Sequence, residues 1–293
     1  MFRNKKIDEY GNIVFAAVND LFKVCEQNAL SKTDLLLCFQ NGFRSWDATP
    51  SIGIGEEGLD SLQGFNSAFA CGLPHTTDDM DYFKKMNPLD FNGISEFERI
   101  LHEEMLRYLN MWENSYILRL LIQLSHLANG EHYDWNLSIN ELIKKRGGVK
   151  SNVIETDILK QFSLVPTFEL VLKSAYNRDL RNGIAHSQCV VVQHGIIFKT
   201  PKNYDRHKLE GVTFEEWEKL FLYSYLLVVG IRKVLKDLSD MYTQHLIRQK
   251  CGIPILVPNR DGTSWYYNNT YPYTYPNKPE AIWRFIKPDW AVD

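Results

Sequence analysis

Apolar and aromatic side chains recur every three or four residues through the middle of the chain, and this spacing most constrains the fold. The clearest run extends from Phe97 to Tyr116, and such a period places its apolar groups on one face of a helix. Ser95 and Glu98 stand at its head in the arrangement of a capping box. The pattern predicts one long amphipathic helix that reaches about Leu127.

Two further helices are predicted between this run and residue 186. Ser138 and Glu141 form a second capping box, and the helix that begins there should stop at the glycine pair 147–148. Pro166 is suited to the first position of another helix, whose apolar stripe continues to Ile184. We therefore expect a single helix over 166–186.

After residue 187 the spacing changes from helical to strand-like. Residues 190–198 read as two short strands around a tight turn at His194. Thr213 and Glu216 then form a capping box at the head of the longest helix, which runs toward His245. Residues 253–267 predict a second hairpin, followed by a tail rich in proline and tyrosine.

The first 92 residues are less regular. Residues 13–25 have helical spacing, and Ser31 with Asp34 resembles a helix start. Glycines between 53 and 64 superficially match a dinucleotide-binding loop, but no predicted strand precedes them and two acids occupy the place of a pyrophosphate. Three acids in 78–81 could hold a divalent cation or simply form a solvated helix start, namely Asp78, Asp79 and Asp81.

These elements predict a mainly α-helical protein with one hairpin before the last long helix and one after it. We divide the chain into an N-terminal, mostly helical region of unknown role (1–92), a helical domain (93–249) and a C-terminal hairpin with an aromatic tail (250–293). The tail's rings could stack on unpaired bases. Burial against the helices or against a partner chain explains them more simply, because buried area is the main source of aromatic stabilisation.

Composition narrows the functional classes. The 293 residues carry a net charge of -3, so nonspecific coating of nucleic acid is excluded and any nucleic-acid role must rest on a local patch. Five scattered cysteines include no Cys-x-x-Cys pair, which argues for a reducing compartment and against a disulfide scaffold or zinc ribbon. The polar first ten residues resemble no signal sequence. We therefore expect a cytoplasmic protein.

The sharpest local motif is Arg181-Asn182, three further residues, then His186. It resembles the HEPN family, whose members carry Arg, four to six residues and then His, often with a polar residue directly after the Arg. The hairpin and closing long helix that follow are similar to the order of elements in many HEPN domains. The resemblance covers about 93–247 and implies a HEPN-like helical bundle. A second arginine–histidine pair within the same range of spacings is Arg119 and His126, with six residues between them and no polar residue after the arginine.

The motif residues suit RNA cleavage by the neighbouring 2'-hydroxyl. That reaction needs a base, an acid and a cation that stabilises the phosphorane charge. Histidine as a residue type can accept or donate a proton near neutral pH, so His186 can perform either proton transfer. Arg181 can fork onto two phosphate oxygens, and Asn182 can support them. The scheme requires no metal or cofactor. The alternative is structural, since an arginine and a histidine at a helix C-terminus also interact favourably with the helix dipole.

The resemblance also implies partners. HEPN proteins form homodimers whose two motifs meet in one composite site, and they act as toxins with a neutralising antitoxin or as phage-defence effectors that cut tRNA or other RNAs. Arg178 shares the helix face of Asn182 and His186, so we expect it to bind RNA. Lys144, Lys145 and Arg146 form a basic run that could contact RNA backbone or be a solvated helix end.

Two other functions remain open at this stage. In one, the chain is a catalytically silent HEPN-like module in which the motif binds a nucleotide or stabilises a dimer, while the first ninety residues sense a ligand or partner. In the other, the acids at 78–81 serve a metal-dependent enzyme.

Overall fold

The computed structural model describes residues 3–31, 33–40, 96–199, 210–258, 264–273 and 282–284. Its helices are α1 (Arg3–Asn28), α2 (Asp34–Gln40), α5 (Glu96–Glu113), α6 (Ser115–Ala128), α7 (Ile139–Lys145), α8 (Lys150–Val153), the π-helix η2 (Ile154–Ile158), α9 (Pro166–Ala175), α10 (Arg178–Ala185) and α11 (Phe214–Gln249). Its strands are β1 (Val190–Val192), β2 (Gly195–Lys199), β3 (Glu210–Thr213), β4 (Ile253–Pro258), β5 (Trp265–Tyr273) and β6 (Ile282–Arg284).

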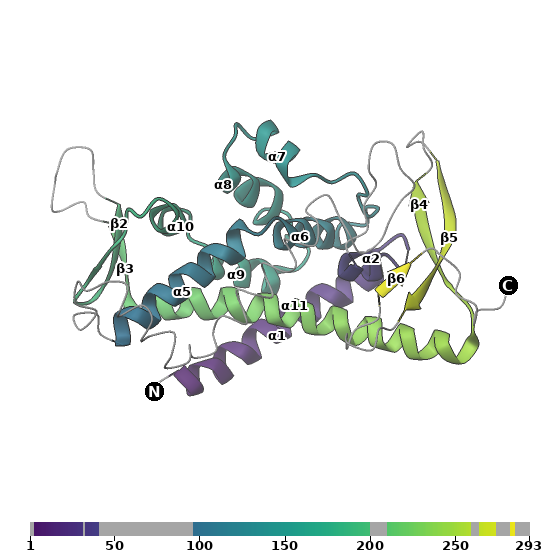
Figure 1. The fold of residues 1–293 in the computed structure, drawn as a ribbon, viewed down its shortest axis with the longest axis horizontal. Helices are drawn as coiled ribbons and strands as arrows, with labels where there is room; N and C mark the ends of the chain where they lie inside the picture. The colour runs from purple at the N-terminus through teal and green to yellow at the C-terminus, as the bar shows by residue number, and fades with distance from the viewer. Residues whose placement is uncertain are drawn as a thin grey trace, which may run out of the picture.

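Helix α11 runs through the length of the molecule, whereas α7, α8 and α10 lie farther from it (Figure 1). Helix α1 packs lengthwise against α11, and α5, α6 and α9 complete the bundle. Leu21, Leu124, Leu172 and Leu227, from four different helices, are each at most 1% exposed. The N-terminal helices α1 and α2 therefore share one core with the central helices.

Two small antiparallel sheets lie at opposite ends of α11 (Figure 1). Strands β1 and β2 form the hairpin expected before α11, in which Val192 pairs with Gly195. Strands β4 and β5 form the hairpin expected after it, in which Ile255 pairs with Asn268. The mainly helical fold with a hairpin on either side of the longest helix is thus confirmed. Strands β3 and β6, which the pattern did not indicate, each add a third strand.

The predicted caps at Ser138 and Thr213 are confirmed, whereas the one at Ser95 lies outside the described residues. The Ser138 side chain accepts a hydrogen bond from the amide of Glu141 at 3.4 Å, and α7 begins at Ile139, directly after this cap. Gly147, with φ 80°, follows this helix in the left-handed region that favours glycine. At the head of α11, the Thr213 hydroxyl and the Glu216 carboxylate bond reciprocally with each other's backbone amides.

Two predicted helices are broken, and the prediction of single helices was wrong there. The run expected to reach Leu127 is divided into α5 and α6 at Asn114, whose side chain accepts from the amide of Ile117 at 3.2 Å. The helix expected over 166–186 is divided into α9 and α10 at Tyr176 and Asn177. In both places an asparagine caps a new helix, so the chain changes direction although the apolar spacing continues.

No helix in the described ranges is both long and apolar enough to cross a bilayer. The four described cysteines, Cys25, Cys38, Cys189 and Cys251, are free thiols. The glycine-rich stretch, the three acids at 78–81 and the end of the aromatic tail lie outside the described residues. The expectations placed on them stay predictions.

Candidate functional site

Helix α10 carries the Arg-Asn-x3-His motif, and its start is fixed by the turn that breaks the predicted helix. The Asn177 side chain accepts a hydrogen bond from the amide of Leu180 at 2.9 Å. The amide of Asn177 in turn donates to the Tyr108 hydroxyl at 3.0 Å. Because Tyr108 belongs to α5, the turn holds α10 at a defined place on the bundle.

The middle of α10 lies directly on the hairpin. A Cβ atom placed on Gly183 would be 2.8 Å from the Cβ of Phe198, closer than real carbon contacts allow. Glycine is therefore required for this helix-to-strand approach. The hairpin expected after the motif is thus in contact with the motif helix.

Arg181 points into the protein. The residue is 7% exposed, and its guanidinium forms an ion pair with the carboxylate of Glu113 at the end of α5. Its Nη1 also lies 2.8 Å from Asn182 Oδ1 and 3.4 Å from Ser151 Oγ. Burial lowers the pKa of Arg181, but an arginine remains charged at neutral pH. The guanidinium is accordingly positioned by partners from three segments.

The carboxylate of Glu113 holds a second cation. Lys150 Nζ lies 3.0 Å from Glu113 Oε2 and donates to the Glu113 backbone carbonyl at 2.8 Å. Burial lowers the pKa of Lys150 as well. One carboxylate at the α5–α6 break therefore joins α8 to α10.

Asn182 connects this interior network to the surface. Its Oδ1 accepts hydrogen bonds from Arg181 and, at 3.2 Å, from the Ser151 hydroxyl. Both acceptor directions of the carbonyl are thereby used. The two amide protons of Asn182 have no acceptor among the described residues and remain available to a ligand.

His186 ends the helix and is exposed. Its backbone amide donates to the carbonyl of Asn182 at 3.0 Å, and Ser187 follows with φ 53°, so the chain turns sharply here. The imidazole makes no hydrogen bond or ion pair with another described residue. The motif thus divides into an inward arginine and an outward histidine, with Asn182 between them.

Arg178 is one turn before Asn182, at the surface. Its Nη1 lies 2.8 Å from Glu155 Oε2, and its Nη2 donates to Asn152 Oδ1 at 3.2 Å. The side chain is 41% exposed. Arg178, Asn182 and His186 therefore share the helix face that their spacing predicts, while Arg181 does not.

The basic run at 144–146 divides in the same way. Arg146 is engaged by Asp157, with its Nε 2.9 Å from Oδ2, whereas Lys144 and Lys145 are exposed. Asn152 bonds both the Arg146 carbonyl and the Arg178 guanidinium. This contact brings the end of α7 close to the start of α10.

The second Arg–His spacing is not a site of the same kind. Arg119 is 2% exposed and donates to the Leu137 carbonyl in the core. His126 lies 3.8 Å from a carboxylate oxygen of Glu131. This second arginine–histidine pair therefore supports the bundle, so the spacing alone does not define the environment found around α10.

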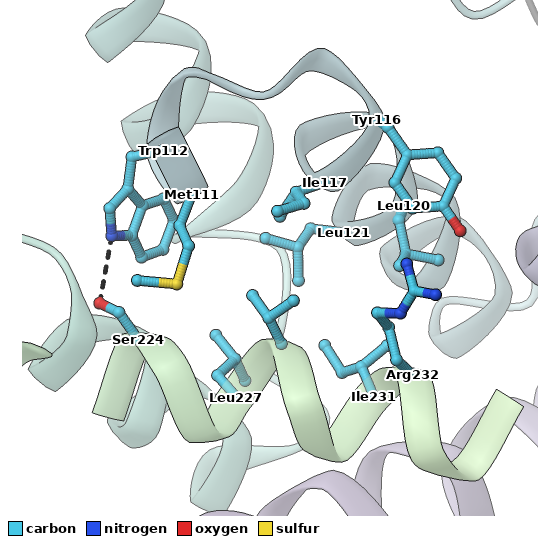
Figure 2. Close-up of a pocket in the computed structure, with 11 residues that line it drawn as sticks. Met111, Trp112, Tyr116, Ile117, Leu120, Leu121, Ser224, Leu227, Ile231 and Arg232 are labelled. Carbon is cyan, nitrogen blue, oxygen red and sulfur yellow. Dashed lines mark hydrogen bonds between the residues drawn. The ribbon is translucent and has the colours of Figure 1, made fainter. Parts of the chain in front are cut away.

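A small cavity lies between the α5–α6 break and α11 (Figure 2). Aliphatic and aromatic side chains form most of its wall, and the Trp112 indole donates to the Ser224 hydroxyl at one end. The free volume is about 10 Å³, which is room for about one water molecule. We regard it as a packing defect in the core.

An open groove of about 600 Å³ runs between α1 and the start of α11. Glu9, Glu215 and Glu216 line it, together with Tyr10 and Tyr223, whose rings meet edge to face at 5.2 Å. Glu216 is already used as the cap of α11, and this interaction lowers its pKa. The acidic lining makes the groove unsuitable for a nucleic acid.

Within the described ranges, no three histidine, cysteine, aspartate or glutamate side chains gather as metal ligands. Sequence reasoning missed Glu113, Ser151 and Tyr176, which lie near the motif together with Lys150. No signal in the sequence indicated Glu113, because the apolar spacing predicted a helix that continues past it.

Comparison with protein families, curated proteins and solved structures finds no match to this chain. The residues around α10 are therefore the basis on which a function can be proposed.

Proposed function

We propose that the chain is a HEPN-like endoribonuclease that needs no metal and works as a homodimer. It would cleave RNA by attack of the 2'-hydroxyl and leave a 2',3'-cyclic phosphate. The single observation that carries the proposal is the exposed, unengaged imidazole of His186 on the same helix face as Asn182 and Arg178.

The roles follow from exposure and chemistry. His186 would transfer a proton, because its ring reaches solvent and histidine titrates near neutral pH. The free amide protons of Asn182 and the guanidinium of Arg178 would bind phosphate oxygens. Arg181 would position Asn182 through the 2.8 Å hydrogen bond to its Oδ1. The exposed Lys144 and Lys145 would extend the RNA-binding surface.

A dimer would supply the second proton-transferring group. One chain offers a single histidine on this face of α10, whereas cleavage needs both a base and an acid. Apolar side chains near the helix favour association: Val190 is 62% and Val192 is 39% exposed, and both belong to β1 at the edge of its sheet. Pairing two copies here would bring two His186 rings and two Arg178 guanidinium groups together.

An RNA cleavage assay in EDTA tests the proposal. The purified protein and the variants Arg181→Ala and His186→Ala are incubated with mixed RNA. The proposal expects cleavage by the unmodified protein in EDTA and its loss in both variants. Activity that returns only with Mg²⁺ would instead indicate a metal-dependent enzyme, for which Asp78, Asp79 and Asp81 are the first candidates.

A second candidate function is a catalytically silent module that binds a nucleotide or stabilises a dimer. The observation in its favour is the enclosure of Arg181, which is 7% exposed and engaged by Glu113, Ser151 and Asn182. Such an arginine can serve the fold alone. No cleavage with or without Mg²⁺, together with a stable dimer, would favour this candidate.

By family resemblance the enzyme would act as a toxin or an anti-phage effector, with tRNA among the RNAs it cuts and an antitoxin as its regulator. Expression in a bacterial host tests this setting. The unmodified chain should arrest growth and His186→Ala should not.

A further inference from the structure

Donor groups converge on one carboxylate beneath α10. Glu113 forms ion pairs with both Arg181 and Lys150, the latter at 3.0 Å. The Ser151 hydroxyl lies beside the same guanidinium, 3.4 Å from its Nη1, and donates to Asn182. Two positive charges therefore meet a single negative charge, and the Ser151 hydroxyl lies beside one of the two cations.

The carboxylate occupies an unfavourable position. Glu113 is the last residue of α5, where the helix dipole is negative and repels an anion. Its side chain is 32% exposed, so it can leave toward solvent. Lys150 would stay in place without it, because it also donates to the Glu113 backbone carbonyl at 2.8 Å. The cations hold Glu113 there, and the helix does not favour it.

Two buried donors beside Ser151 remain unsatisfied. Arg181 Nε and the Tyr176 hydroxyl are buried and have no hydrogen-bond partner. Their residues are 7% and 8% exposed. Burial raises the pKa of Tyr176 to about 12, partly offset by the nearby Ser151 hydroxyl, so the phenol stays a donor. Unsatisfied buried donors are costly, and the Glu113 carboxylate accepts a hydrogen bond from neither of these two.

We infer that this cluster is a phosphate-binding site in which Glu113 acts as a built-in competitor. A phosphate offers more acceptor oxygens than a carboxylate and binds strongly to paired cationic and neutral donors. Lys150 and Arg181 would carry its charge, and Ser151 and Tyr176 would bond its remaining oxygens. The inference rests on the proposed function only in naming RNA as the natural source of the phosphate.

Two sources share this chemistry, the diester of an RNA chain and a terminal or free phosphate. Isothermal titration calorimetry at low salt separates them. Inorganic phosphate serves as one probe, and a dinucleotide of 2'-deoxyribose, which cannot undergo 2'-hydroxyl attack, serves as the other. A response to the dinucleotide alone identifies the diester, and a response to inorganic phosphate alone identifies the terminal or free group.

The decisive variant is Glu113→Gln, which removes the competing charge and keeps the shape. We expect its Kd for at least one probe to fall about tenfold or more, as a loss of one repulsive charge pair predicts. Lys150→Met in the Glu113→Gln background should abolish this gain. Glu169→Gln is the matched control, because it removes the partner of Lys173 in an exposed pair on α9 and should leave the Kd within about twofold.

A folded Glu113→Gln variant with unchanged affinity for both probes overturns the inference. If that variant does not fold, Glu113→Asp takes its place, since the shorter side chain cannot reach both cations and a smaller gain is then expected. Phosphate binding does not involve the His186 ring, so His186→Ala should bind both probes as the unmodified chain does. If Glu113→Gln binds a phosphate probe more tightly but the unmodified protein cleaves no RNA, the proposed function alone is refuted. If the unmodified protein cleaves RNA but Glu113→Gln gains no affinity for either probe, this inference alone is refuted.

Discussion

The guanidinium of Arg181 and the carboxylate of Glu113 form an ion pair that joins the middle of α10 to the end of α5. The arginine side chain is 9% exposed and the glutamate side chain 32%. This pair fixes the helix that carries His186, and it also keeps the motif arginine away from solvent. Its two members should therefore respond differently to substitution.

Arg181→Met should lower the free energy of unfolding by about 2–4 kcal/mol, because it leaves Glu113 beside a buried apolar group. Glu113→Gln should cost only about 1 kcal/mol, since glutamine retains an oxygen acceptor and the site is partly exposed. Urea denaturation followed by circular dichroism measures both. Lys173→Met, which breaks the exposed pair with Glu169, should change stability by less than about 0.5 kcal/mol. Equal losses for Arg181→Met and Lys173→Met would contradict the structural role of the pair.

Gly183→Ala should destabilise the protein by about 1–3 kcal/mol, because the new methyl group would overlap Phe198 on β2. Gly11→Ala is its matched control. Gly11 lies inside α1, where an added Cβ would meet only Phe15 at an ordinary 3.8 Å. The control should stabilise the helix by about 0.5–1 kcal/mol. Thermal melts of the two variants should thus shift in opposite directions, and two shifts of the same sign would count against the close approach of α10 and β2.

Asp34 predicts a pH dependence of stability. The residue is 1% exposed, and burial raises the pKa of its carboxyl to about 7, well above the ordinary value of 3.8. The pKa of this carboxyl is therefore higher in the folded than in the unfolded protein. Its contribution to the free energy of unfolding is complete below the ordinary pKa and is lost as the pH rises through about 7. The unmodified protein should therefore gain about 1 kcal/mol relative to Asp34→Asn between pH 8 and pH 6. Urea titrations at both pH values measure the difference, and parallel pH profiles of the two proteins would refute the assignment.

Val190→Lys should weaken the dimer, because it places a charge on the exposed apolar edge next to α10. Multi-angle light scattering after size exclusion should then report a monomer at concentrations where the unmodified chain is a dimer. RNA cleavage should fall with the dimer fraction. Met241→Lys, which changes a residue 54% exposed on the distal part of α11, should leave both measurements unchanged. A fully active Val190→Lys monomer would contradict the composite site.

Much of the fold follows from local chemistry that can be read in the sequence. Ser138 and Thr213 indicate where their helices begin, because each side chain accepts a hydrogen bond from a backbone amide three residues later. The helix breaks at Asn114 and Asn177 could not be predicted in this way. Asparagine also occurs inside helices, and the apolar spacing continues past both residues. Strand β3 could not be predicted either, because it is short, mostly exposed and shows no alternation of buried and exposed residues.

The candidate site was only half predictable. The shared face of Arg178, Asn182 and His186 follows from helical geometry, and α10 preserves it. The inward course of Arg181 depends on Glu113 and Ser151, which arrive from other helices. Spacing along one helix contains no information about such partners. The second Arg–His pair illustrates the limit, since Arg119 precedes His126 by a comparable number of residues and yet lies in the core.

The most direct test of the central claim is the chemical nature of the RNA ends produced in EDTA. Unmodified protein should generate 2',3'-cyclic phosphate ends, and His186→Ala should reduce their rate of formation by about 100-fold or more. His194→Ala, which changes another exposed histidine in the β1–β2 turn, should cut at the normal rate. Melting temperatures should be equal in all three proteins. Cyclic phosphate ends formed equally fast by His186→Ala, or no cleavage by the unmodified protein, would contradict the account.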